Sequence, residues 1–237
     1  LDGFYDSSAS QIVFDASVDS DFATVDADQQ GSVNFDLSSL PLVTGTSVIP
    51  QPEIEIAVSV SGIDEGGTQR SADRVGVATA MVNSDIQLTQ QTQYYGGPFS
   101  NTGTYPPTAD EPTTMTITWN ITNTSNAVDN TTVTTTLPNY VEWLGQVTPS
   151  SADISYNSVR REITWDLGEV APSTGFAEAA REVSFQVSVL PSISQIGNTV
   201  DLTTDVVLVG EDTFTDVLLR VIRRPHSTRL LNDVQSG

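Results

Sequence analysis

The chain has no cysteine, no lysine and a single histidine among its 237 residues. Without cysteine there is no disulfide bond, no thiolate nucleophile and no Cys-ligated zinc. Without lysine, no Lys–Asn isopeptide cross-link can form. The one histidine, His226, follows Pro225 in a polar stretch that we expect to be a linker, whereas a Ser-His-Asp triad needs a histidine held in a rigid pocket. These absences indicate that the chain is not an enzyme.

Long apolar runs and helical periodicity are absent as well. No run of about 18 apolar residues occurs, so we expect no membrane insertion by this segment. Aromatic residues make up only 7% of the chain, while Thr, Ser and Val are abundant, which is typical of all-β proteins. The length fits two sandwich domains of about 100 residues each. We therefore predict two tandem immunoglobulin-like β-sandwich domains.

Positive charge is scarce. The 30 acidic residues outnumber the 9 basic ones, all of them arginine, and the formal net charge is −21. A nucleic acid would be repelled by this charge, which excludes it as a partner. An acidic surface suits solubility and divalent cations such as Ca²⁺.

The clearest structural signal lies between residues 113 and 143. Apolar residues alternate with Thr and Asn over residues 113–123, which is the period of a half-buried strand. A polar cluster at 123–130 predicts an exposed loop. A second strand over 131–136 ends at Leu137-Pro138, since proline cannot donate to a sheet ladder, and a third follows with Val141 and Trp143.

The rest of the chain divides around a segment rich in Gly and Pro. Before it, the clearest strand is 53–61, with Ile54, Ile56, Val58 and Val60 expected to point inward. Residues 95–112 are either a domain boundary or a long crossing loop. We predict an N-terminal sandwich over 1–95, a C-terminal sandwich over 96–224, and a tail or linker over 225–237.

The C-terminal half resembles the conserved β-sandwich repeats of large bacterial and archaeal cell-surface proteins, most of them without an assigned function. The motif is a Thr-rich strand ending in Thr-Asn, then a turn, then V-x-x-x-L-P. It stands here as Thr114 to Asn123 and Val133 to Pro138. The segments Tyr94–Phe99, Asn123–Asn126, Ser192–Gly197 and Gly210–Phe214 look closest to uncharacterised surface proteins of candidate-phyla (Patescibacteria-type) bacteria. This resemblance implies an extracellular, cell-surface location and a structural role.

Carboxylates in the first half are candidate ligands for calcium. Asp19 and Asp21, and Asp26 and Asp28, are two residues apart and share a face if the segment is extended. Hard cations take several carboxylate and carbonyl oxygens, although as exposed charges these residues are also ordinary. Further candidates are Asp64, Glu65, Glu211 and Asp212.

Three sequence patterns match the acceptor site of N-glycosylation, at Asn120, Asn123 and Asn130. Trp119, Trp143 and Trp165 lie in phase with apolar neighbours, so we predict that they belong to the core rather than to a sugar-stacking platform. An exposed aromatic patch is the alternative for Tyr94, Tyr95, Phe99 and Tyr105, which we expect instead to pack at the domain junction.

These observations predict a non-enzymatic structural or adhesive module of a large cell-surface protein, as a stalk, surface-layer or filament component. Its partners would be neighbouring domains, copies of itself, other surface proteins or glycans. The alternative is a carbohydrate- or protein-binding module, a lectin-like adhesin that uses calcium.

Overall fold

The structure is a computed structural model that describes residues 3–26, 34, 36, 43–44, 47–195, 197–231 and 233. The chain divides into two compact units, Leu1–Pro41 and Leu42–Gly237. In the first unit, β1 (Phe4–Asp6) pairs with β2 (Gln11–Val13), and a single 3-10 turn, η1, spans Ser20–Phe22.

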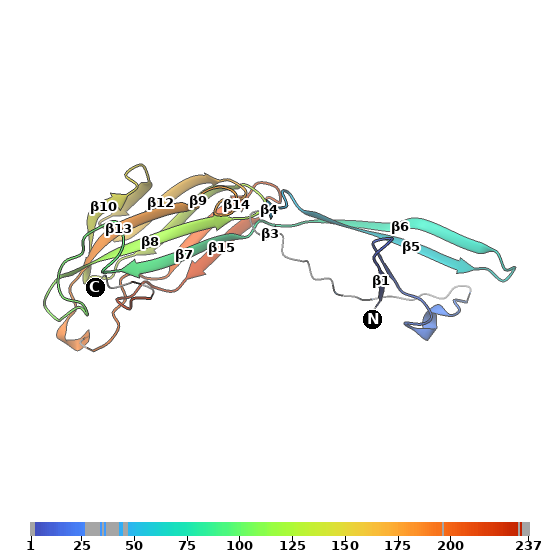
Figure 1. Ribbon diagram of the computed structural model, residues 1–237, viewed down its shortest axis with the longest axis horizontal. Coiled ribbons are helices and arrows are strands. Elements are labelled where there is room, and N and C mark those ends of the chain that lie inside the picture. Colours follow the sequence, from blue (N-terminus) through green and yellow to red (C-terminus); the bar gives the residue numbers. More distant parts are fainter. Residues whose placement is uncertain are drawn as a thin grey trace. The chain divides into compact units, whose positions relative to one another are not determined.

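The second unit contains an antiparallel β-sandwich (Figure 1). One sheet has the order β10-β13-β8-β7 and the other has the order β11-β12-β9-β14-β15. The four strands of the first sheet are β7 (Ile86–Gln93), β8 (Thr113–Asn123), β10 (Val141–Thr148) and β13 (Arg181–Val189). The five strands of the second are β9 (Val128–Thr136), β11 (Asp153–Asn157), β12 (Glu162–Val170), β14 (Val206–Asp212) and β15 (Leu218–Arg223). A 3-10 turn, η2 (Ile193–Gln195), follows β13.

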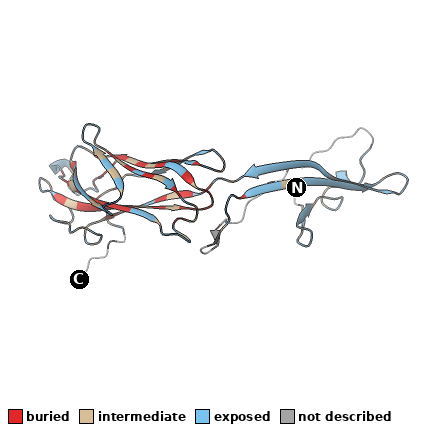
Figure 2. Cartoon of the chain, turned by 90° about the horizontal axis from the view of Figure 1, so that it is seen from above, coloured by how far each residue is buried: buried red, intermediate tan, exposed pale blue. Residues whose placement is uncertain are grey.

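The core lies between the two sheets, where buried and exposed positions alternate along the strands (Figure 2). The apolar positions predicted on residues 113–123 are all fully buried, and Trp119 stacks on Trp165 of the other sheet with ring centroids 6.5 Å apart. Trp143 is half-buried and packs against Phe185 and Tyr156. The period-2 pattern therefore gave the correct face of the central strand, because one face of β8 meets the core.

The sandwich begins earlier and ends later than the sequence suggested. The predicted N-terminal domain, 1–95, includes β7, but β7 pairs with β8 along its whole length and buries Ile86 and Leu88 in the core. The predicted tail, 225–237, includes His226 and Thr228, which are both buried. Residues 225–231 therefore belong to the sandwich, because the side chains of His226 and Thr228 are buried on its open side next to β7.

The all-β fold class is confirmed, and the described residues before Ser84 form separate two-stranded sheets. β3 (Val43–Thr44) pairs with β4 (Ser47–Val48), and β5 (Glu53–Ile63) pairs with β6 (Gln69–Met81). We call Glu53–Met81 the arm. The strand predicted at 53–61 is present, but in the described structure its apolar side chains are not part of a second sandwich core.

Candidate functional site

The chain passes from the arm into the sandwich at residues 82–84, and a buried polar network surrounds this junction. Pro52 and Val82 close the base of the arm with a backbone hydrogen bond of 2.9 Å. The side-chain amide of Asn126 donates to the carbonyl of Val82 at 3.0 Å. The Ser84 amide then donates to the Asp212 carboxylate at 2.6 Å. The loop before β9 and the end of β14 therefore hold the residues that connect the arm to β7.

Asp212 is fully buried, no arginine among the described residues forms an ion pair with it, and N–H groups supply all the hydrogen bonds that its carboxylate accepts. Its carboxylate accepts from the backbone amides of Ser84, Phe214 and Thr215 and from the side chain of Asn126. Burial by itself would raise the pKa of this carboxyl, but the four hydrogen-bond donors outweigh burial and hold it below its ordinary value. Asp212 is thus an anion that organises the junction.

The loop predicted to be exposed at 123–130 forms the rest of this network. Asn123 is buried and its amide donates to the carbonyls of Asn126, Val170 and Ala171. The Ser84 hydroxyl donates to the Asn123 carbonyl oxygen at 2.7 Å. These side chains are buried because they satisfy backbone groups of a tight turn, which their polarity alone does not indicate.

A second buried polar group lies around the only histidine. The Trp119 indole N–H donates to His226 Nε2 at 2.9 Å, and the Thr92 hydroxyl lies 3.1 Å from His226 Nδ1. Since Nε2 accepts, the neutral ring carries its proton on Nδ1, which donates to the Thr92 oxygen. His226 therefore cannot act as a base toward Thr92, and burial lowers its pKa to about 3.

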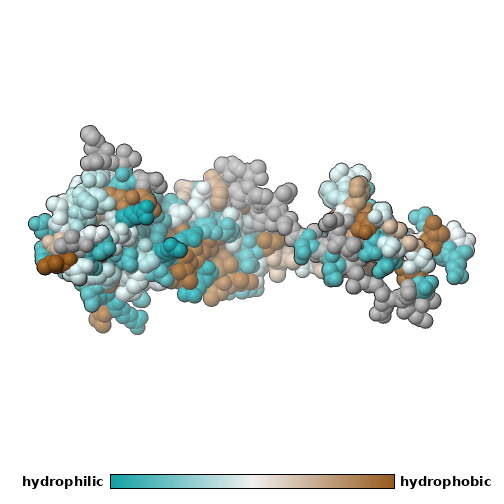
Figure 3. Space-filling view, turned by 90° about the horizontal axis from the view of Figure 1, so that it is seen from below, coloured by the Kyte–Doolittle hydropathy of each residue, from teal (hydrophilic) through white to brown (hydrophobic). Residues whose placement is uncertain are grey.

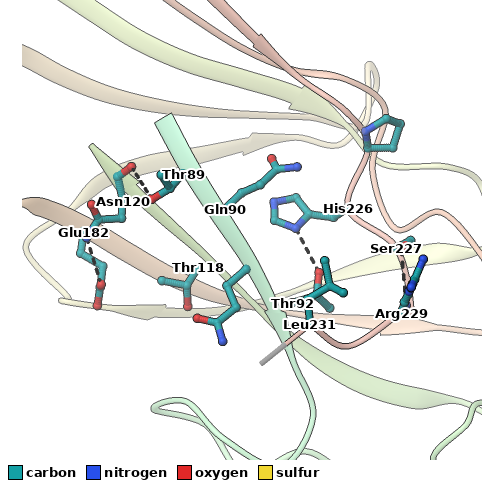
Figure 4. A pocket seen from close by; sticks show the side chains of 12 residues that line it. Thr89, Gln90, Thr92, Thr118, Asn120, Glu182, His226, Ser227, Arg229 and Leu231 are labelled. Atoms are coloured by element: carbon teal, nitrogen blue, oxygen red, sulfur yellow. Dashed lines mark hydrogen bonds between the residues drawn. The ribbon is translucent and has the colours of Figure 1, made fainter. Parts of the chain in front are cut away.

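A polar groove of about 610 Å³ lies beside β7 (Figure 4). Its floor comes from the outer faces of β7, β8 and β13 and carries hydroxyl, amide and carboxylate groups, and the segment after β15 forms a wall. The side chains of Gln91 and Arg229 have no hydrogen-bond partner among the described residues, whereas the Asn120 amide donates to Glu182 at 3.4 Å. Among the lining residues that Figure 4 labels are Thr89, Thr118, Asn120, Glu182 and Arg229.

The predicted calcium ligands do not converge in the described part of the chain. Asp19 caps η1 and accepts from the Asp21 amide at 3.0 Å, and Asp28 lies outside the described residues. Within the described ranges, no three or more His, Cys, Asp or Glu side chains are grouped as metal ligands would be. A calcium site at Asp19, Asp21, Asp26 and Asp28 stays a prediction.

Two of the further calcium candidates have their carboxylates engaged. Asp212 faces N–H donors, whose polarity suits an anion rather than a cation at that place. Asp64 accepts from the backbone amides of Gly66 and Thr68 and pairs with Arg70 at 3.0 Å. These hydrogen bonds hold the pKa of Asp64 below its ordinary value, and they define the turn at the tip of the arm.

The three candidate glycosylation sites lie in different surroundings. Asn130 is exposed, with a left-handed backbone at φ 50°. Asn120 is half-buried in the floor of the groove. Asn123 is fully buried with its amide hydrogen-bonded, so the folded domain leaves no room for a glycan there. Modification of Asn120 or Asn130 stays a prediction.

The aromatic residues of the Gly- and Pro-rich segment form a cluster on the sandwich itself. The rings of Tyr94 and Tyr105 stack at 5.3 Å, and Tyr95 meets both of them edge-on. The Asp233 carboxylate accepts from three successive backbone amides, those of Tyr94, Tyr95 and Gly96. This arrangement fixes the end of the described chain to the segment after β7.

The sequence patterns did not indicate that Asp212, Asn126 and His226 belong to buried hydrogen-bond networks. The signal for Asp212 was weak: an aspartate ahead of a Thr-Phe-Thr turn, where its carboxylate can accept backbone amides. Nothing local distinguishes Asn126 or His226 from surface residues, because their partners lie 86 and 107 positions away in the sequence.

No protein-family model and no curated protein matches the chain. Solved structures with a similar arrangement include BcpA, the major pilin subunit of Bacillus cereus, at 13% identity and a TM-score of 0.36, covering 72% of this chain and 47% of that one. The RrgA Jo.In complex aligns at 10% identity and a TM-score of 0.35, covering 73% of this chain and 89% of that one.

A third similar structure is the C-terminal domain of the AgI/II polypeptide BspA of Streptococcus agalactiae, at 10% identity and a TM-score of 0.32, covering 74% of this chain and 59% of that one. The chain thus spans about half the length of the BcpA chain that it matches. No helix in the described residues is long and apolar enough to cross a membrane. These similarities concern strand arrangement, and the affiliation with candidate-phyla bacteria stays a prediction.

Proposed function

We propose that this chain is a non-enzymatic structural or adhesive module of a cell-surface protein, and that the arm joins it to other copies or to neighbouring domains. The observation that carries the proposal is the arm itself. β5 and β6 have 11 and 13 residues and pair only with each other in the described structure. A two-stranded hairpin of this kind is at best marginally stable in water unless something packs on it or pairs with its edges.

The arm exposes apolar side chains that a solvent-facing hairpin would not need. Val60 is 59% exposed and Ile63 is 77% exposed, and Figure 2 shows both strands of the arm as exposed. On one face of the arm, Ile54 and Val58 lie opposite Ala80 and Gly76, so the small residues of β6 leave the larger apolar side chains of β5 uncovered on that side. Long apolar strands with free edges pair with further strands.

Charge pairs do not compensate for this exposure. The Arg74–Glu55 and Arg70–Asp64 ion pairs are both 3.0 Å long, but their side chains are largely exposed. Exposed pairs of this type contribute about 0–1 kcal/mol each. We therefore expect the arm to associate with a partner that covers its apolar face and pairs with its edges. The buried hydrogen-bond network around Asp212 would then transmit force from the arm to the sandwich.

The test replaces apolar surface on the arm while keeping β-branched side chains. We expect the double substitution Ile54→Thr and Ile56→Thr to raise the protein concentration at half-maximal assembly at least about tenfold, since about 1.4 kcal/mol of lost apolar burial corresponds to that factor. Light scattering and negative-stain microscopy measure the assembly.

The matched control is Val159→Thr, at a position that is 92% exposed in the turn between β11 and β12. It should assemble like the parent chain. Unchanged assembly of the double arm variant would contradict the proposal. Repeating the series with Ca²⁺ and then with a chelator tests the calcium dependence expected for Asp19, Asp21, Asp26 and Asp28.

The polar groove supports a second candidate function, recognition of a neutral glycan. Its floor combines amide and hydroxyl groups, and its two charged residues, Glu182 and Arg229, have opposite signs. Such a lining matches ligands with many hydroxyl groups better than it matches lipids or anions. Calorimetric titration with neutral oligosaccharides tests this function, and binding that Asn120→Ala abolishes would favour it.

A further inference from the structure

The edge of β15 that faces away from β14 is unpaired within the described ranges. It combines exposed apolar residues with positive charge. Among the described residues, β14 is the only strand that pairs with β15. Leu218 is 68% exposed and Ile222 is 48% exposed. Figure 3 shows that apolar residues gather at the surface of the sandwich. No hydrogen bond within the described part of the chain reaches the backbone of Leu218–Ile222 from a partner other than β14.

This edge is also the most basic stretch of an acidic chain. Residues 218–224 contain three of the nine arginines and no acidic residue. Arg223 is engaged, since its guanidinium donates to the Leu88 carbonyl and to Gln87. Arg220 and Arg224 form no ion pair with any described carboxylate, although the chain has 30 acidic residues. The β15 edge thus presents unneutralised positive charge between exposed apolar side chains.

The β5 strand of the arm has the opposite pattern. It begins Glu53-Ile54-Glu55-Ile56-Ala57, so the carboxylates lie on one face and the isoleucines on the other. Glu53, Glu55 and Ala57 are all exposed, and Glu55 also pairs with Arg74 of β6 at 3.0 Å through largely exposed side chains. The arm as a whole, residues 53–81, has five acidic residues and two arginines. The charges of the β5 edge and the β15 edge are therefore complementary.

We infer that β5 of one copy adds to the free edge of β15 in a second copy, as an antiparallel sixth strand of the five-stranded sheet. This inference rests on the proposed assembly role of the arm and names the surface that the arm meets. The register that pairs Glu55 with Arg220 also places Ile54 opposite Val221 and Ile56 opposite Leu219.

That register agrees with the core of the sandwich. Leu219 and Val221 are partly buried and pack against the core, so the isoleucines of the incoming strand would extend the apolar layer. On the other face, Ala57 lies opposite Leu218 and the carboxylates lie beside arginine. A shift of the register by one residue would place the carboxylates over the apolar core layer and the isoleucines beside Arg220. The burial of carboxylates disfavours that shifted register.

The pairing joins two different surfaces, the arm of one copy and the sandwich of the next. Each copy then retains a free arm or a free β15 edge, so the contact repeats head to tail and forms a filament or an open array rather than a closed dimer. Complementary charge at the contact helps to fix the register, while the backbone hydrogen bonds between the strands provide affinity.

Disulfide trapping tests the pairing, because a chain without cysteine forms no background cross-link. Two single variants, Ala57→Cys and Leu218→Cys, are mixed under mild oxidation. Directly opposite residues of antiparallel strands have Cβ atoms about 4.5–5.5 Å apart, so we expect a mixed disulfide between the two chains. Thermal unfolding of each variant verifies that it is folded.

The control mixture pairs Ala57→Cys with Val159→Cys, at a position that is more exposed than Leu218 but lies away from β15, in the turn between β11 and β12. We expect the 57–218 mixture to give at least about ten times more mixed disulfide than the control, and we expect Arg220→Glu in the Leu218→Cys chain to reduce it. A mixed disulfide at the control level in samples that assemble by light scattering would overturn this pairing and leave the proposed function standing. Absence of both assembly and disulfide would overturn both.

Discussion

At the scale of single residues, His226 shows how burial changes the role of a titratable group. Its ring is buried, and its Nε2 accepts the indole proton of Trp119, which requires a neutral imidazole. A protonated ring would put two N–H groups face to face and place an unpaired charge in the core. The histidine is thus a structural acceptor inside the sandwich.

This arrangement predicts a pH-dependent stability. The folded pKa of His226 is about 3, below the value of about 6.5 in an unfolded chain. The unfolded state therefore binds one proton more than the folded state between these values, so stability falls as pH falls through that window, by about 2 kcal/mol from pH 7 to pH 5. His226→Gln removes this proton while its carbonyl oxygen can still accept from Trp119.

Urea unfolding at pH 7 and pH 5 measures the effect. We expect the parent chain to lose about 2 kcal/mol more between the two values than His226→Gln does. An equal pH dependence of the two proteins would show that His226 is not buried as a neutral group.

The sequence could not predict this role. Its composition placed His226 in a polar tail, since Pro225, Ser227 and Arg229 surround it. The residues that bury it, Thr92 and Trp119, are 134 and 107 positions away. Only the topology, which brings the segment after β15 alongside β7, makes the histidine internal.

At the scale of the structural elements, local periodicity predicted the strands well and their partners less well. The alternation over residues 113–123 correctly identified the buried face of β8, because the strand lies between two neighbours inside a sandwich. The equally regular alternation of β5 identified a strand but not its exposure. Period 2 reports that one face is apolar, and it does not report whether this chain or another covers that face.

The junction between arm and sandwich depends on one buried carboxylate. Asp212→Asn keeps the size of the side chain but replaces an acceptor oxygen by an NH₂ group, which then faces N–H donors. We expect this change to reduce the free energy of unfolding by about 2–4 kcal/mol. Thermal unfolding at pH 7 should show a melting temperature lower by about 5–15 °C.

Asp153→Asn is the matched control, since Asp153 is exposed on the edge strand β11, and it should leave the melting temperature unchanged. The effect of Asp212 has a defined pH range. Its pKa is depressed, so its stabilisation is complete above the unfolded value of about 3.9 and is lost as pH falls through the lower folded value. A fully stable Asp212→Asn variant would contradict the stabilising role of the Asp212 carboxylate at the junction.

At the scale of the whole molecule, assembly has to overcome a large common charge. Two copies with a formal net charge of −21 each repel over a distance set by salt, about 10 Å at 0.1 M and about 3 Å at 1 M ionic strength. The attraction between Glu55 and Arg220 acts at contact and is screened less than the repulsion between whole molecules. Higher salt should therefore favour association through the arm.

Multi-angle light scattering of the chain across protein concentration, at 0.1 M and at 1 M NaCl, tests most directly whether the arm joins one copy to the next. We predict a mass that rises continuously with concentration, without a plateau at the dimer, and a rise that begins at lower protein concentration in 1 M salt. A monodisperse monomer at every concentration and at both salt levels would contradict the claim that the arm joins one copy to the next.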